Sequence, residues 1–113
     1  MNKIILVGNL AKDPEIKVIE ESGKALTKII IAVQRTFKNT DGEREADFIQ
    51  VTFFDKKAET VAEFLKKGDP ISVSGRLQTR NYEDKEGVKK YITEVIADEF
   101  QFINGRKSNE NIG

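Results

Sequence analysis

The segment from Asp47 to Pro70, DFIQVTFFDKKAETVAEFLKKGDP, joins one predicted strand directly to one predicted helix. Residues 48–54 are rich in β-branched and aromatic side chains, which favour strands. Over residues 55–67, apolar side chains recur at the i, i+3, i+4 and i+7 spacing of one helix face, at Ala58, Val61, Ala62 and Leu65. We expect Asp55 to cap the start of this helix and Gly68 to end it.

Four further segments predict strands, two before this unit and two after it. Each is dense in branched aliphatic residues or alternates apolar with polar side chains. They are residues 3–10, 25–35, 71–82 and 91–103. Five strands with a helix between the third and the fourth is the order of an OB-fold, a five-stranded Greek-key barrel that binds oligonucleotides or oligosaccharides. The sequence therefore predicts an all-β domain with one helix.

Composition narrows the chemistry that is available to the chain. Its 113 residues suffice for one domain and include no cysteine and no histidine. We therefore exclude disulfides, thiolate nucleophiles and imidazole catalysis, and expect no enzyme activity, cofactor or metal. Lysine plus arginine equals aspartate plus glutamate at 19 each, so an anionic partner must be held by a local patch. No apolar run approaches a membrane span or a secretory signal, which predicts a cytoplasmic protein without a membrane partner.

Strand parity divides the side chains of two predicted strands into an inner and an outer set, because successive residues of a strand point to opposite faces. The inner set is expected to contain Ile49, Val51, Phe53, Ile71, Val73, Gly75 and Leu77. The outer set is expected to contain Phe48, Gln50, Thr52, Phe54, Arg76, Arg80 and Tyr82. The polar members of the outer set predict a face in contact with water.

Aromatic rings beside cations on a wet sheet face favour binding of single-stranded nucleic acid. Bases stack on the rings and phosphates pair with the cations, without any need for a particular base sequence. Two other interpretations stay open: Phe48 and Phe54 could be covered by a loop or a second subunit, and Tyr82 could be an ordinary hairpin residue. The remaining phenylalanines of the later segments are expected in the core or against the helix. They are Phe53, Phe64, Phe100 and Phe102.

Two rival functions remain open. A small metal-dependent nuclease could use the carboxylates of Glu43, Glu45 and Asp47 to hold a divalent cation, with Arg44 as a phosphate clamp. The ordinary explanation of these acids is a solvated charged loop. A barrel of the same fold could instead serve as an accessory protein that holds other proteins as well as DNA.

Five motifs in one order resemble the bacterial single-stranded DNA-binding proteins. They are NKIILVGNL at 2–10 followed by DPE at 13–15, DFIQVTFF at 47–54, AEFLKKG at 62–68, VSGRLQTR at 73–80 followed by Tyr82, and YITEV at 91–95. The resemblance spans about residues 1–103 and implies an OB-fold single-stranded DNA-binding domain there. It implies sequence-independent protection of single-stranded DNA during replication, recombination and repair, in the cytoplasm and at the nucleoid. The polar residues 104–113 lack periodicity and are expected to form a flexible tail.

The same resemblance implies which residues bind DNA. The stacking rings of the family fall at Phe37, Phe48, Phe54 and Tyr82. The cations carried over are Lys3, Lys56 and Arg80, to which proximity adds Arg35 and Arg76. Three ring positions that are commonly tryptophan in the family are Phe37, Phe48 and Tyr82 here, and smaller rings predict weaker stacking per base.

Two expectations concern assembly. Many family members continue to an acidic tip that recruits replication and repair proteins, and this chain resembles a short form, so recruitment of that kind is not expected. In the first strand Ile5 and Val7 point away from Ile4 and Leu6, and one small barrel can bury only one of those faces. Together with the family's common homotetramers, this predicts a homotetramer, with a dimer as the second choice.

Overall fold

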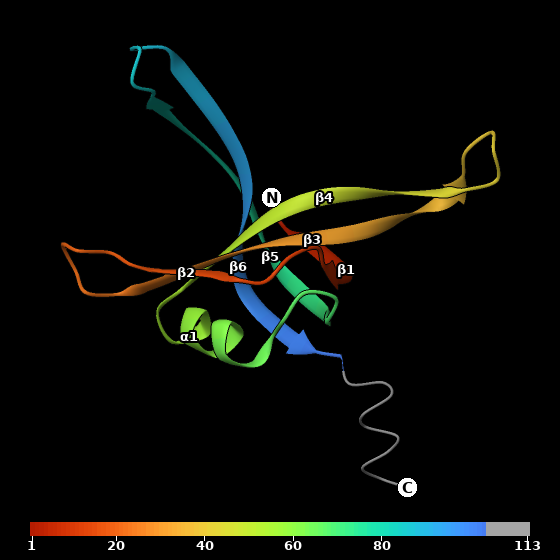
Figure 1. Cartoon of the computed structure of the whole chain (residues 1–113), viewed down its shortest axis with the longest axis horizontal. Helices are drawn as coiled ribbons and strands as arrows, with labels where there is room; N and C mark the ends of the chain where they lie inside the picture. Colours follow the sequence, from red (N-terminus) through yellow and green to blue (C-terminus); the bar gives the residue numbers. More distant parts are fainter. Residues whose placement is uncertain (104–113) are drawn as a thin grey trace, which may run out of the picture.

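The computed structural model describes residues 1–103 as six strands and one helix (Figure 1). In chain order these are β1 (Ile4–Leu10), β2 (Glu15–Val18), β3 (Ala25–Lys38), β4 (Arg44–Phe54), α1 (Asp55–Phe64), β5 (Pro70–Glu83) and β6 (Lys89–Phe102). The predicted tail at 104–113 lies outside the described residues. No helix within residues 1–103 is long and apolar enough to cross a membrane.

Five of these strands close into a barrel. The sheet runs in the order β1-β5-β6-β4-β3-β2, and β1 also pairs with β3 through Asn9 opposite Ala32 and Leu10 opposite Ile31. Neighbouring strands of this sheet are antiparallel except β4 and β6, which are parallel. The predicted OB-fold is confirmed. The helix follows the third strand of the barrel, because β2 only extends β3 as a hairpin.

The strand β2 was not expected. Its four residues are all exposed, and a segment this short gives too little alternation to be recognised. It exists because it pairs with β3 over Glu15 to Val18. Sequence periodicity does not report such a pairing, since it depends on the neighbouring strand.

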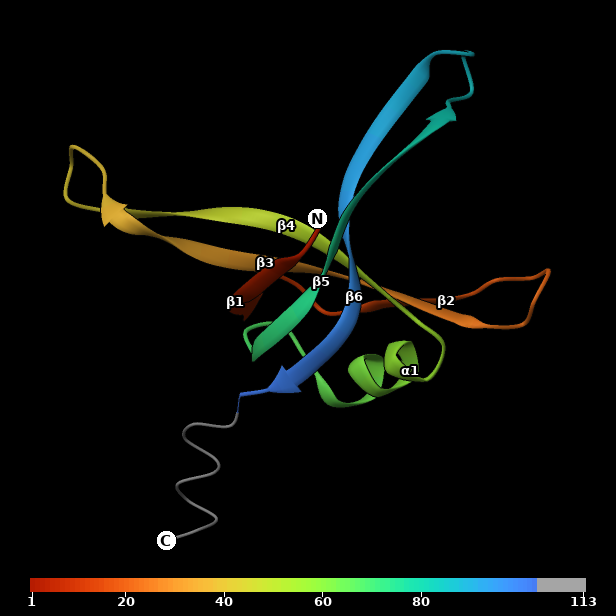
Figure 2. The ribbon, with the colours of Figure 1, turned by 180° about the vertical axis from the view of Figure 1, so that it is seen from behind.

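The helix α1 packs against one end of the barrel (Figures 1 and 2). Ala58 and Val61 are fully buried, and the Thr27 hydroxyl of β3 donates a hydrogen bond of 2.7 Å to the Ala58 carbonyl. Two expectations about this helix were wrong. It ends at Phe64 rather than at residue 67, because the backbone of Leu65 is extended. Asp55 does not cap it: Phe54 holds the N-cap position, and no side chain bonds there.

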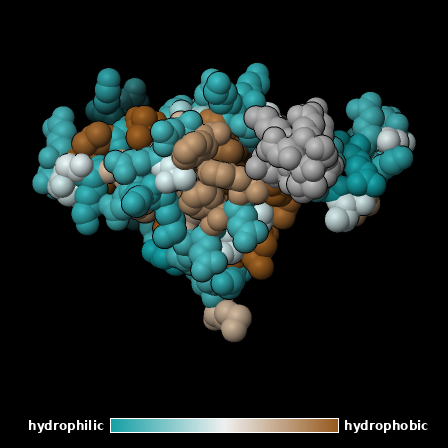
Figure 3. All heavy atoms as spheres, turned by 90° about the horizontal axis from the view of Figure 1, so that it is seen from below, coloured by the Kyte–Doolittle hydropathy of each residue, from teal (hydrophilic) through white to brown (hydrophobic). Residues whose placement is uncertain are grey.

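The core fills the barrel between these elements. It comprises Leu6, Leu10, Ile29, Ile31, Val51, Phe53, Ala58, Val61, Leu65, Ile71, Val73 and Val95. Three expectations about burial were wrong, two from strand parity and one for the helix residue Phe64. Thr52 is buried rather than wet, Leu77 is 44% exposed rather than inside, and Phe64 is 61% exposed. The ring of Phe64 lies 6.1 Å from that of Phe102, and both side chains are exposed. Figure 3 shows apolar side chains gathered near the middle of the face seen from below.

Three hairpins project from the barrel and give the molecule extents of 53 × 40 × 29 Å (Figures 1 and 2). They are the β2–β3, β3–β4 and β5–β6 hairpins. In the β5–β6 hairpin, residues 76–83 lie opposite residues 89–96 without a break in register. We call this part the β5–β6 arm. Leu77 is exposed because it belongs to this arm, beyond the point where β5 leaves the barrel.

Candidate nucleic-acid interface

Strand pairing joins side chains from four strands into one outer sheet face. Lys28 of β3 lies opposite Thr52 of β4, Thr52 beside Ile96 of β6, and Ile96 opposite Arg76 of β5. Directly paired residues point to the same face, so every second residue on either side of this row shares it. The outer sheet face therefore carries Leu26, Lys28, Phe48, Gln50, Thr52, Phe54, Glu94, Ile96, Arg76, Gln78 and Arg80.

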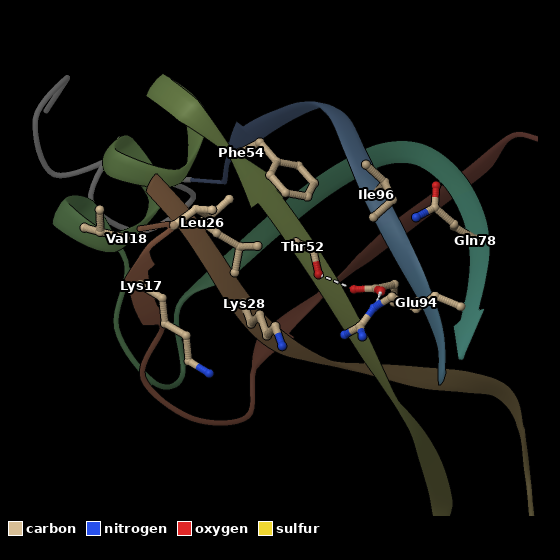
Figure 4. Close-up of a pocket in the computed structure, with 11 residues that line it drawn as sticks. Lys17, Val18, Leu26, Lys28, Thr52, Phe54, Gln78, Glu94 and Ile96 are labelled. Carbon is tan, nitrogen blue, oxygen red and sulfur yellow. Dashed lines mark hydrogen bonds and ion pairs between the residues drawn. The ribbon is translucent and has the colours of Figure 1, made fainter. Parts of the chain in front are cut away.

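A groove of about 430 Å³ is hollowed into this face (Figure 4). Apolar side chains of Leu26, Phe54 and Ile96 line it, together with Val18 and Ile19 from the β2–β3 hairpin. Its cationic lining is Lys17, Lys28 and Arg80. An apolar surface bordered by cations has the chemistry to accept a flat base and the phosphates on either side of it.

The four predicted rings are all exposed, but the structure distributes them over three places. Phe48 (67% exposed) and Phe54 (39%) stand on the outer sheet face, and Phe54 also lines the groove. Tyr82 (45%) lies on the β5–β6 arm, and Phe37 (71%) on the β3–β4 hairpin. The register of β3 and β4 shifts between Gln34 and Lys38, so parity does not fix the face of Phe37. The two hairpin rings extend the aromatic surface outward from the barrel.

The predicted cationic side chains differ in the carboxylates with which they already pair inside the protein. Arg80 donates from Nε to the buried Glu94 at 2.7 Å, and Arg76 lies 3.5 Å from the exposed carboxylate of Asp98. The side chain of Lys3 is exposed. Asn2 bonds both the N–H and the carbonyl of Leu77, and this pairing places Lys3 beside Arg76 of β5. Arg76 and Arg80 thus share the outer sheet face, with Lys3 at its edge.

Arg35 lies on the other side of the β3–β4 hairpin from Phe48. Its guanidinium bonds Asp47 at 2.8 Å and Glu45 at 3.0 Å, and the hydrogen bond from Arg35 lowers the pKa of Asp47. This pairing offsets the charge that Arg35 would offer to a phosphate. It also occupies two of the carboxylates on which the nuclease alternative depends. No group of three or more acidic side chains within residues 1–103 is arranged to hold a metal ion.

Lys56 is exposed in the first turn of α1, two residues beyond Phe54. It does not line the groove. The structure therefore brings Phe54, Arg80 and Phe48 to one surface and places Lys56 next to that surface, at the end of β4.

Comparison with known proteins is consistent with this geometry. The model of the family described as the single-strand binding protein family matches residues 1–103. The chain belongs to this family. Single-stranded DNA-binding protein 1 of Staphylococcus aureus strain Mu50 is 52% identical over 110 residues, which cover 97% of this chain and 70% of that protein. Single-stranded DNA-binding protein 1 of Clostridium acetobutylicum is 52% identical over 107 residues, covering 95% and 97%. The single-stranded DNA-binding protein of Clostridium tetani is 48% identical over 103 residues, covering 91% and 70%.

In this member of the single-strand binding protein family, two cations that line the groove and one exposed ring on the β5–β6 arm were missed from the sequence. Lys17 and Lys28 line the groove, and Tyr91 is 73% exposed on the β5–β6 arm. The parity of β3 could have found Lys28, because it lies on the face opposite to that of the buried Ile29 and Ile31. Lys17 had no such signal, since β2 was not recognised. Tyr91 pairs with Asn81, so it faces away from Tyr82.

A buried acid lies among the cations of this family member's groove. The side chain of Glu94 is 3% exposed and accepts a hydrogen bond from Thr52 Oγ1 at 2.5 Å (Figure 4). It also accepts hydrogen bonds from Arg80 Nε at 2.7 Å and Gln50 Nε2 at 3.2 Å. Burial raises the pKa of Glu94, but the bonds from Thr52 and Arg80, with the charge of Arg80, outweigh burial and lower it. Glu94 is therefore a carboxylate at neutral pH.

Proposed function

We propose that the protein binds single-stranded DNA without sequence specificity and leaves it chemically unchanged. Exposed phenylalanines on a sheet face beside Lys28 and Arg80 carry this proposal. Stacking on a ring tolerates any base, since every base has a flat face, and cations replace the counterions of the phosphates. The names of the relatives at about half identity support the same function. Binding would keep unpaired DNA from reannealing and from nucleases during replication, recombination and repair.

The contacts are assigned as follows. Phe48 and Phe54 stack bases on the sheet face, and Phe37 and Tyr82 stack bases along the two hairpins. The phosphates meet Arg80, Arg76, Lys3 and Lys56, joined by the groove lysines Lys17 and Lys28. Arg35 contributes least among the cations, because two carboxylates already bind it. Residues 1–103 are the DNA-binding domain in this proposal.

The proposed assembly is a homotetramer. Ile5 is 66% and Val7 is 55% exposed on the side of β1 that faces away from the core. Burial of these side chains against other copies would remove an apolar strip from water. Several barrels in one assembly would also join their cationic grooves, which explains how a chain of zero net charge could hold a long polyanion.

A titration with fluorescently labelled oligothymidine tests the proposed function. Phe48→Ala and Phe54→Ala should each weaken binding by about 1–3 kcal/mol, because each removes one stacking surface. Affinity of the unmodified protein should fall with salt, with a log–log slope of about −0.7 for each phosphate contacted.

Phe64→Ala is the matched control, since it removes a phenylalanine about as exposed as Phe48 from α1, away from the outer sheet face. It should bind oligothymidine as the unmodified protein does. Absence of binding by the unmodified protein, or an equal loss in the control, would overturn the proposal.

A further inference from the structure

The groove that we propose binds DNA is lined by one buried carboxylate, that of Glu94. Glu94 opposes phosphate binding by Coulomb repulsion, and its burial costs solvation energy. It is nonetheless fully engaged with three donors on β4 and β5, at 2.5, 2.7 and 3.2 Å. Attraction of DNA cannot explain a carboxylate at this position, and the hydrogen-bond partners of Glu94 indicate another role.

The bond between Arg80 and Glu94 uses only one edge of the guanidinium. Within residues 1–103, Arg80 bonds Glu94 through Nε, and no protein acceptor meets its terminal nitrogens Nη1 and Nη2. A guanidinium is planar and its five donors have fixed directions. Fixing the Nε edge therefore fixes the direction of the Nη edge as well. The side chain of Arg80 is 40% exposed and lines the groove, so that edge is available to a phosphate.

Glu94 is itself held in place from a different strand. Thr52 Oγ1 and Gln50 Nε2 of β4 both donate to Glu94 Oε1, while Arg80 binds Oε2. The two carboxylate oxygens of Glu94 therefore bond different strands, Oε1 to β4 and Oε2 to β5. The hydrogen bonds from β4 fix the plane of the Glu94 carboxylate. That plane in turn fixes the orientation of Arg80 on β5.

Arg76 offers a contrast on the same strand face. Its ion pair with Asp98 is 3.5 Å long, and both side chains are about half exposed. Exposed pairs of this kind constrain little, since solvent screens them and the side chains retain their rotamer freedom. Arg76 and Asp98 therefore provide an internal comparison for Arg80 and Glu94.

We propose that Glu94 is a positioning residue that holds Arg80 through Nε so that its Nη edge meets a phosphate of the bound strand. The proposal rests on the proposed binding of single-stranded DNA and adds a specific role to it. Because Glu94 already holds Arg80 in place, Arg80 loses less conformational freedom when DNA binds. This gain in binding free energy outweighs the repulsion between Glu94 and the phosphates.

A double-mutant cycle on the full chain tests it, with labelled oligothymidine as the probe. Glu94→Gln should weaken binding about fivefold to tenfold when Arg80 is present. In the Arg80→Ala background the same substitution should cause no further loss, because there is no arginine left to position. Asp98→Asn is the matched control and should change affinity less than about twofold.

Two results would overturn the proposal. One is an unchanged or tighter complex for Glu94→Gln, which would show that the acid acts only as a repelling charge. The other is an equal loss with and without Arg80, which would show a purely structural role. If the unmodified protein fails to bind oligothymidine, the proposed function falls; if it binds but the cycle shows no coupling, only this inference falls.

Arg80→Lys provides a second test that does not disturb the acid. Lysine keeps the positive charge but has no second edge of fixed direction. Binding should weaken about fivefold to tenfold while the salt slope is retained. This loss should exceed that of Arg76→Lys, because the Arg76 guanidinium is paired only with an exposed carboxylate. Affinity of Arg80→Lys equal to that of the unmodified protein would contradict the proposal.

Discussion

Three arginines of this chain differ in how strongly neighbouring carboxylates hold them. Arg35 is held by two carboxylates, Arg76 by one distant exposed carboxylate, and Arg80 by one buried carboxylate through a single nitrogen. All three carry the same charge, but only Arg80 is both fixed and open to the groove. The partners of each side chain decide how much of its charge a phosphate can use.

Glu94 also gives the domain a pH-dependent stability. Its pKa in the folded state lies below the ordinary value of 4.5, so its contribution is fully present above that value and is lost as pH falls through the folded pKa. Glu94→Gln should therefore flatten the fall of the melting temperature between about pH 5 and pH 3. Thermal unfolding followed by circular dichroism across this range measures the effect.

The melting temperature of the Glu94→Gln variant should still fall to some extent at low pH. The pKa values of Glu15 and Asp47 are also lowered, by hydrogen bonds from Lys12 and Arg35 respectively, and both still titrate. Identical curves for the variant and the unmodified protein would show that Glu94 does not couple its ionisation to folding.

The strand β5 serves two structures in turn. Its first half belongs to the barrel, where Ile71 and Val73 are buried, and its second half forms the β5–β6 arm with Tyr82 and Arg80. The register with β6 shifts between Ser74 and Gly75, at the point where the two halves meet. This irregularity directs the arm, with the side chains that we propose bind DNA, away from the barrel.

Gly75 permits a close approach of two strands at that point. A Cβ atom there would overlap the carbonyl oxygen of Ile96, which is backbone and cannot move aside without shifting β6. Gly75→Ala should therefore lower the free energy of unfolding by about 1–3 kcal/mol, measured by urea denaturation. Ser74→Ala, one residue earlier and only partly buried, is the control and should stay within about 0.5 kcal/mol of the unmodified protein. Equal stability of the two variants would refute this role for Gly75.

The exposed face of β1 bears on the assembly of the whole molecule. A barrel of this size has one interior, and Leu6 and Leu10 already use it from β1. Ile5 and Val7 are left on the outside, next to Ser74 and Ser72 of β5. An exposed apolar strip of this kind is typical of a contact between subunits.

Val7→Glu should break the proposed homotetramer, because burial of an unpaired carboxylate in a subunit contact is costly. Analytical ultracentrifugation should show four copies for the unmodified protein and a smaller species for the variant. Val88→Glu, on the loop of the β5–β6 hairpin, alters a residue that is similarly exposed and should leave the mass unchanged. A monomeric unmodified protein, or a Val7→Glu variant of unchanged mass, would contradict the assembly.

Several features of this chain follow from the sequence alone, because they depend on local periodicity. The order of barrel strands and helix, the burial of Val51 and Phe53, and the exposure of Phe48 and Phe54 all follow from alternation along one segment. The unpaired aliphatic residues of β1 were evident for the same reason. These properties need no knowledge of which strands are neighbours.

Other features were decided only by the tertiary structure, because they depend on pairing between distant segments. Thr52 has the outward parity of Phe54 but is buried, since β6 and Glu94 lie against it. Leu77 has the inward parity of Val73 but is exposed, since the sheet has left the barrel by then. The β2 strand and the bond from Arg80 to Glu94 likewise require the final register. Periodicity fixes the side of a strand on which a residue lies, whereas burial and charge pairing depend on what the fold places against that side.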